Sequence, residues 1–461
     1  MTATAPPGRP APPAAWPGPP GQRPGAPTGA RATGAALSTT GGTGTAVATV
    51  PGTSVPLPTG RPTPRRMRLV ALGLVAVGVL VGLVGAWSFS NADAALERAD
   101  ANAAQLVRLQ ELQTRLVSAD ASATNAFLVG GLEPPDRRAV YDDAMTTAAE
   151  LVAQAARAQP ADGTALAALN VAMLDYAADV EQARAANRQG LPVGAQYLRN
   201  ASATLRADAL PVLAALIEAN EDRVSSEFGA ARAAWIPVVL VSLLALGAVV
   251  AASVWLARRT HRYLNLRLVG AGVVLLVLLV GSTVTLGSVS TAVDRTRVGD
   301  FAAASALSRA RLAAYDAKAN ESLTLISRGS GAAFDEAWEA SSAITLDTLR
   351  DAHVAGAEDL RSAWDTYATS HYLVRDADAA GEWDLAVEDA TSDAEDSVNA
   401  TFAAFDARTA DALAEASQGT SDTLAEARSG LGLAVWLAAL AGLAVAGLSW
   451  TGFARRIEEY R

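Results

Sequence analysis

The chain has 461 residues, of which 51% are hydrophobic and 18% charged, and its formal net charge is −10. This acidic balance argues against nucleic acid as a partner, because nucleic-acid binding needs a basic surface. Cysteine is absent, which excludes disulfides and thiol chemistry, so the fold has to be stable through packing alone.

Residues 1–66 are rich in Pro, Gly and Ala, and we predict that they form a disordered cytoplasmic tail. A segment with so few large apolar side chains cannot compensate the entropy that it would lose on folding. Pro10–Pro13 and Pro17–Pro20 match the polyproline-II pattern of peptides that bind proline-recognition domains. A Pro-rich composition produces such patterns by itself, so we interpret the segment as a solubilising tail.

Four uncharged apolar runs follow, and each is long enough to cross the ~30 Å hydrocarbon core of a bilayer as a helix. They are residues 69–90, 233–257, 268–293 and 429–454. The first run begins too far along the chain for a cleaved secretory signal, so we expect an uncleaved anchor. None of the runs contains Asp, Glu, Lys, Arg or His, which argues against a transporter with ionisable groups along an intramembrane path.

The distribution of charge predicts the orientation of these runs. The two long loops, 91–232 and 294–428, together contain 23 of the 37 basic residues and 45 of the 47 acidic residues. The remaining 14 basic residues, with only 2 acidic ones, lie in the other segments, including 258–267 and 455–461. By the positive-inside rule, both termini are cytoplasmic and both long loops are extracytoplasmic. We therefore predict a multi-pass protein of the plasma membrane, embedded in the lipid bilayer.

Both long loops have the periodicity of amphipathic helices. Leu106, Leu109, Leu112 and Leu116 recur at three- or four-residue steps in the first loop. Its glycine and proline clusters delimit helices at 92–129, 135–158, 163–189 and 192–234. The second loop has similar breaks near 328–331, 354–356 and 380–381. Short turns predict antiparallel neighbours, so the predicted fold is all-α, with two tandem up-down four-helix bundles outside the membrane.

The outer helices of each predicted bundle are longer than the middle ones and lead directly into the apolar runs. We therefore expect them to continue into the membrane without a break, as a stalk that transmits a shift from the outer tip. Pro211 and Pro237 are expected to kink the fourth helix and the second span.

The two halves of the chain resemble each other, which predicts an internal duplication. Asp120-Ala-Ser-Ala-Thr-Asn125 resembles Asp316-Ala-Lys-Ala-Asn-Glu321, and Tyr176 and Tyr367 each lie fourteen residues before a glycine. Gly78 and Gly82 form a small-xxx-small pair in the first span, which permits close helix contact, including a homodimer. Such pairs are common by chance in a span rich in Ala and Gly.

Catalytic patterns are missing from the sequence. His261, His353 and His371 lie far apart without metal-ligand spacing, and there is no phosphate-binding glycine loop or nucleophile elbow. We therefore expect no enzymatic activity and no metal or cofactor. The many carboxylates are interpreted as the solvated faces of helices.

The corner from Asn125 to Pro135 is the most distinctive local pattern. Its simplest interpretation is structural, because glycines end one helix and prolines begin the next. Since the corner is expected at the membrane-distal tip, it is also a candidate binding surface. The tip of the second half is another candidate, where Trp383 either packs into the bundle or contacts a partner. The candidate partner-binding residues are Gly130, Gly131, Glu133, Arg137, Arg138, Glu382, Trp383 and Asp384.

The residues that follow the last span are too few to form a catalytic domain, since small folded domains need about 40 residues or more, and the tail 1–66 is predicted to be disordered. We therefore expect output to pass through a cytoplasmic partner. The candidate coupling residues are Arg258, Arg259, Arg262, Arg455, Arg456 and Tyr460.

Several of these motifs resemble the GlnX family, actinobacterial membrane proteins with four spans. They are the corner described above, Tyr197–Ser202 with Leu210-Pro211, Trp364–Tyr367, His371, Gly381–Val387 and Glu459–Arg461. The resemblance covers residues 67–461, and the Pro-rich tail departs from it. Each outer domain is also similar to the four-helix sensor bundles of bacterial chemoreceptors and histidine kinases.

The resemblance implies a role in coupling an amino-acid-binding lipoprotein outside the cell to a cytosolic Ser/Thr kinase of the PknG type. The ligand would be glutamate, glutamine or aspartate, bound by the lipoprotein and not necessarily by this chain. Our leading hypothesis is a non-enzymatic transmembrane signal transducer. The alternative is a scaffold of the cell envelope that holds other proteins and transmits no signal.

Overall fold

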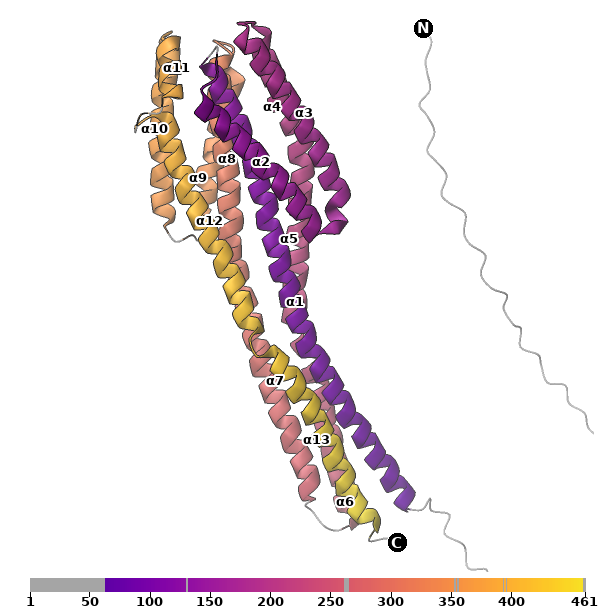
Figure 1. Cartoon of the computed structure of the whole chain (residues 1–461). Coiled ribbons are helices and arrows are strands. Elements are labelled where there is room, and N and C mark those ends of the chain that lie inside the picture. The colour runs from indigo at the N-terminus through magenta and orange to yellow at the C-terminus, as the bar shows by residue number, and fades with distance from the viewer. Residues whose placement is uncertain are drawn as a thin grey trace, which may run out of the picture. The chain divides into compact units, whose positions relative to one another are not determined.

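The computed structural model describes residues 63–129, 132–260, 265–351, 354, 356–392, 394 and 396–458. Within these residues the protein consists of helices and turns without a strand, which confirms the predicted all-α fold (Figure 1). The predicted tail lies almost wholly outside the described residues.

The helices of the first half are α1 (Thr63–Leu128), α2 (Pro135–Ala158), η1 (Pro160–Asp162), α3 (Gly163–Arg188), α4 (Val193–Thr204), the π-helical turn η2 (Leu205–Ala209), α5 (Leu210–Ala233) and α6 (Trp235–Thr260). Those of the second half are α7 (Leu266–Val298), α8 (Asp300–Ile326), α9 (Ala332–Asp351), α10 (Ala357–Ala379), α11 (Trp383–Thr391), α12 (Val398–Arg428) and α13 (Leu431–Glu458). The bounds of α2 and α3 agree with the predicted helices to within one residue.

Four helical stretches are long and apolar enough to cross a membrane, and each contains one of the predicted runs. They are Arg65–Leu128, Val193–Arg258, Leu266–Ile326 and Val398–Arg455. Their outward faces expose large apolar side chains such as Leu69, Leu244 and Trp436, whereas Ala71 and Leu275 lie in a shared core. An apolar face of this kind is stable when lipid covers it.

Small residues let α1 and α13 approach closely within the membrane segment. A Cβ added to Gly442 of α13 would lie 2.4 Å from the Cα of Gly82 and 2.7 Å from the carbonyl oxygen of Gly78. The small-xxx-small pair of the first span therefore contacts another helix of the same chain, which agrees with the role of such pairs in helix packing.

The expected continuity of the outer helices holds for α1, which runs unbroken through 66 residues. The other three are interrupted, at Ala234, at Gly299 and at Ser429-Gly430, where Gly430 has a φ of +86°. Pro237 lies in the first turn of α6, where its missing N–H breaks no helical hydrogen bond, and the interruption at Ala234 comes three residues before it.

Pro211 changes the helix in a specific way. The five residues before α5 form the π-helical turn η2, in which the Leu210 N–H donates to the carbonyl oxygen of Leu205. Proline has no N–H and its ring displaces the carbonyl four residues earlier, so the wider turn relieves a clash. The turn places Arg206 where it contacts both halves of the protein, as described below.

Each half has its own core beyond the membrane-length runs. In the first half, the predicted leucine stripe is buried, with Leu109, Leu112 and Leu116 fully enclosed against α2, α3 and α5. In the second half, Trp338 and Trp364 are fully buried among α8, α9, α10 and α12. The two halves also contact each other, because α1 packs along α8 and Leu128 of α1 belongs to the second core (Figure 1). The sequence did not predict this contact.

Candidate functional site

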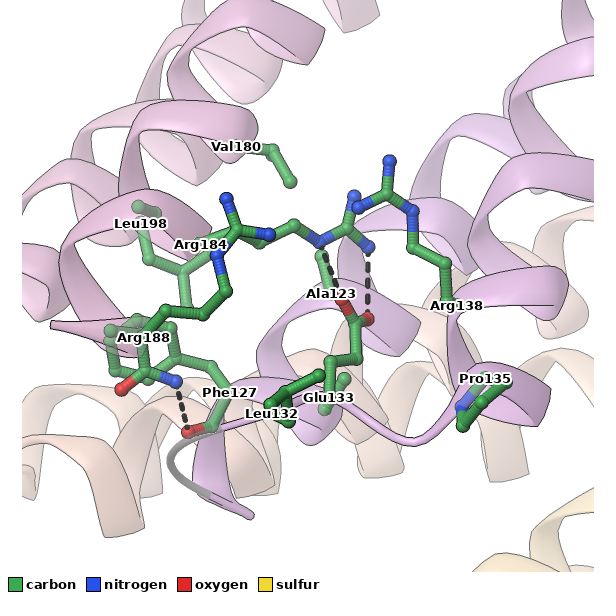
Figure 2. Close-up of a pocket in the computed structure, with 13 residues that line it drawn as sticks. Ala123, Phe127, Leu132, Glu133, Pro135, Arg138, Val180, Arg184, Arg188 and Leu198 are labelled. Carbon is green, nitrogen blue, oxygen red and sulfur yellow. Dashed lines mark hydrogen bonds and ion pairs between the residues drawn. The ribbon is translucent and has the colours of Figure 1, made fainter.

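The corner between α1 and α2 builds a small pocket at the end of α1 that lies away from the membrane run. Pro134 precedes α2 and Pro135 begins it, a position where the fixed φ of proline suits a helix. Gly130 and Gly131 lie outside the described residues. This local geometry places Glu133 beside α3, which returns to the same tip (Figure 2).

A bidentate ion pair forms the centre of this tip pocket. The Arg184 guanidinium on α3 lies 2.9 Å and 3.0 Å from the two carboxylate oxygens of Glu133 (Figure 2). Arg184 is only 8% exposed, and it also contacts Glu181 at 2.8 Å. Arg138 on α2 contacts the same Glu181 at 2.9 Å. The structure therefore brings together two predicted residues, Glu133 and Arg138, with an arginine that the sequence did not single out.

Tyr141 lies beneath this network. The Arg184 guanidinium carbon is 4.1 Å from the centre of its ring, within the range of a cation–π contact. Burial raises the pKa of Tyr141 to about 12, so the phenol is neutral at physiological pH. Its hydroxyl has no hydrogen-bond partner among the described residues. The ring and the ion pair thus fix the Arg184 side chain without using all of its donors.

The tip pocket is small. Its volume is about 150 Å³, whereas sites for drug-sized ligands usually occupy about 300–1,000 Å³. Among its lining residues Leu132 is 86% exposed, and the nearby chain segments also expose Leu191, Val193 and Val129. A small charged socket within an apolar rim fits an inserted protein side chain better than a separate small molecule.

The tip of the second half is arranged differently. Trp383 is half-buried, its indole N–H donates to the carbonyl oxygen of Leu325 at 3.1 Å, and the Arg328 guanidinium carbon lies 3.9 Å from the centre of its ring. Glu382 and Asp384 on either side are exposed. The sequence left open whether Trp383 packs into the bundle or contacts a partner, and these contacts are explained by packing.

The other candidate residues are distributed as follows. Arg137 lies outside the tip pocket and hydrogen-bonds to the Asn125 side chain and to the carbonyl oxygen of Thr391 in the other half. Arg258 and Arg455 are exposed near the ends of α6 and α13. The side chains of Arg259 and Arg456, and the whole of Arg262 and Tyr460, lie outside the described residues.

The polar contact between the two halves was not predicted from the sequence. Arg206, in the π-helical turn, lies 2.8 Å from a carboxylate oxygen of Asp120 and 2.7 Å from one of Asp316. These two aspartates are the first residues of the two similar segments noted in the sequence, so one arginine bridges those segments. A second bridge is formed by Arg311, which contacts Glu111 and Asp406. The similarity of the segments was visible, but no local pattern identified Arg206 as their partner.

Comparison with known proteins adds one finding. Residues 95–229, from the middle of α1 to near the end of α5, match the model of a family described as an actinobacterial sensor domain. This region is similar to a sensor domain. Together with the four candidate membrane helices, the match supports a sensing membrane protein of the actinobacterial type. No curated protein and no solved structure matched the chain.

Proposed function

We propose that this protein is a non-enzymatic signal transducer that receives an extracytoplasmic protein partner at the tip pocket and passes the change through the membrane. The observation that carries this proposal is α1. Its 66 residues extend roughly 100 Å at the usual helical rise. One unbroken helix therefore joins the tip pocket, the contact between the halves and the first membrane span.

A rigid helix can transmit a shift when its neighbours hold it in two discrete arrangements. Near the membrane α1 has exposed or half-buried polar contacts with α12: Arg428 lies 3.0 Å from Asp93, and the Ser421 hydroxyl donates to Asp100 at 2.8 Å. Partly exposed pairs of this kind contribute only about 0–1 kcal/mol each, so they can exchange at little cost.

The direction of the signal and the identity of the partners belong to the same proposal. The excess of basic residues around the spans supports cytoplasmic termini and extracytoplasmic bundles. The resemblance to GlnX supports a solute-binding lipoprotein outside and a Ser/Thr kinase inside, with glutamate, glutamine or aspartate as the sensed solute. Arg258 and Arg455, which are exposed near the ends of α6 and α13, are the described candidates for contact with such a cytoplasmic partner.

Partner binding at the tip is tested with two exposed leucines. Leu132 lines the pocket, whereas Leu174 on α3 is similarly exposed but does not line it. Leu132→Glu should abolish co-purification of a solute-binding lipoprotein with the full chain, because a charge replaces an apolar contact. Leu174→Glu should retain it. Equal retention by both variants would reject the tip as the docking site.

Transmission is tested by crosslinking, which the absence of native cysteine makes specific. Asp100→Cys with Ser421→Cys places a thiol pair between α1 and α12. The rate of disulfide formation in membranes should change when the lipoprotein binds, and the Leu132→Glu background should remove that change. An unchanged rate despite bound lipoprotein would favour the alternative, a scaffold that transmits nothing.

A further inference from the structure

A second cavity lies between the two halves, away from the tip pocket. It has a volume of about 330 Å³ and is lined by side chains of α1, α2, α8 and α12. This volume falls within the usual range of about 300–1,000 Å³ for ligand sites, unlike that of the tip pocket. Residues from both halves are needed to form it, so neither half contains the site alone.

The decisive group in this cavity is the ammonium of Lys318 on α8. Lys318 is 5% exposed and lines the cavity. Its Nζ donates to the Glu321 carboxylate at 2.6 Å, and Glu321, which is fully buried, also contacts His371 Nδ1 at 2.8 Å. A lysine ammonium has three N–H donors. The described residues give Nζ a single hydrogen bond, to Glu321, which uses one of these donors.

The carboxylate and one amide oxygen in the described lining of the cavity are already engaged. Asp406, the carboxylate in the described lining, accepts two hydrogen bonds from Arg311 and one from the Tyr315 hydroxyl. The Asn125 side-chain oxygen accepts from Arg137. Because this carboxylate is occupied while the Lys318 ammonium keeps unused donors, the cavity favours an anion. Burial lowers the pKa of Lys318, and an anionic ligand beside it would favour its charged form.

Charge and shape narrow the class of anion. The Glu321 carboxylate pairs with the ammonium and Asp406 lies in the lining, so both would repel a doubly charged ligand and a single negative charge fits better. The rest of the lining includes the ring of Phe402 and the side chains of Ala121 and Ala403. The volume is roughly twice that of a ~150 Å³ cavity that accepts benzene, so an aromatic ring with a short acidic arm fits.

We propose that the cavity between the two halves binds a small aromatic or apolar monocarboxylate, with the Lys318 ammonium as its counter-ion. The ligand would contact α1 and α2 on one side and α8 and α12 on the other. Occupancy would therefore hold the two halves in one arrangement, giving the protein a small-molecule input that is separate from docking of a protein at the tip.

Two matched probes test this with the purified full chain in detergent. 3-Phenylpropionate carries the charge, and 3-phenylpropanamide has nearly the same shape without it. The carboxylate should bind in titration calorimetry and raise Tm as its concentration increases, whereas the amide should bind about tenfold more weakly or worse, because a hydrogen bond to a charged group is lost.

Two kinds of variant locate the site. Lys318→Met should weaken binding of the carboxylate by about tenfold or more, but it also removes a partner of the buried Glu321. Ala403→Phe fills the exposed mouth of the cavity without touching that pair and should abolish binding. Ala404→Phe, the next exposed residue on α12, does not line the cavity and should leave binding unchanged.

Absence of carboxylate binding at millimolar concentration, equal binding of the amide, or retained binding in Ala403→Phe would each overturn the proposal. None of these results depends on co-purification of a lipoprotein, so they leave the proposed function at the tip to its own test.

Discussion

Replacing Gly442 with Ala should separate α1 from α13 in the membrane segment. The new Cβ would lie 2.4 Å from the Cα of Gly82 and 2.5 Å from its backbone nitrogen, whereas carbon atoms in contact normally stand about 3.5–4.0 Å apart. The helices therefore have to move apart by about 1 Å at the crossing. The obstacles are backbone atoms, which cannot rotate away, so relief requires a shift of a whole helix.

Overpacking of this kind typically costs about 1–3 kcal/mol, and we expect the upper end, about 3 kcal/mol, because no side chain is available to yield. The assay is thermal unfolding of the full chain in detergent, followed by circular dichroism. Gly447→Ala is the matched control, since it lies on the same helix and a Cβ there meets nothing within 4 Å. Equal Tm values for the two variants would refute the close crossing of α1 and α13.

Three further predictions concern buried charges. Burial alone would raise the pKa of Glu321, but Lys318 and His371 lower it to about 2. Ionised Glu321 should therefore contribute about 3 kcal/mol to the free energy of unfolding above pH ~4.5, and this contribution should be lost as the pH falls towards 2. Asp120→Asn should lower the free energy of unfolding by about 2–3 kcal/mol, because Asp120 is 1% exposed and the substitution removes an ion pair. Asp316 is 37% exposed, so Asp316→Asn should lower it by under about 1 kcal/mol. Glu133→Gln should cost about 1–3 kcal/mol.

Denaturation of the full chain in detergent measures all three. The acid-dependent loss should disappear in Glu321→Gln; a loss of the same size in that variant would assign it to other groups. Equal costs of Asp120→Asn and Asp316→Asn would contradict their different burial. An unchanged stability of Glu133→Gln would show that the ion pair at the tip pocket contributes nothing in solution.

Much of the candidate site was predictable, though not its centre. The corner and the positions of Glu133 and Arg138 follow from a local pattern of Gly and Pro, and the structure places both residues at the pocket. Arg184 lies 51 residues from Glu133 along the chain, in the middle of an ordinary polar helix face. Nothing in the local sequence distinguishes an arginine that turns inward from one that faces water. The role of Arg184 could therefore be recognised only from the packing of α3 against the corner.

The sequence by itself determined the helices and the four membrane-length runs, because the periodicity of apolar residues, the helix-breaking residues and the length of uncharged segments are all local properties. Only the tertiary structure decided how the halves meet. Arg206 reaches Asp120 and Asp316, which lie 86 and 110 residues away, and it does so from a π-helical turn that precedes Pro211. Such a pairing depends on how α1 packs against α5 and α8, and therefore on free energies summed over whole helices rather than on any segment.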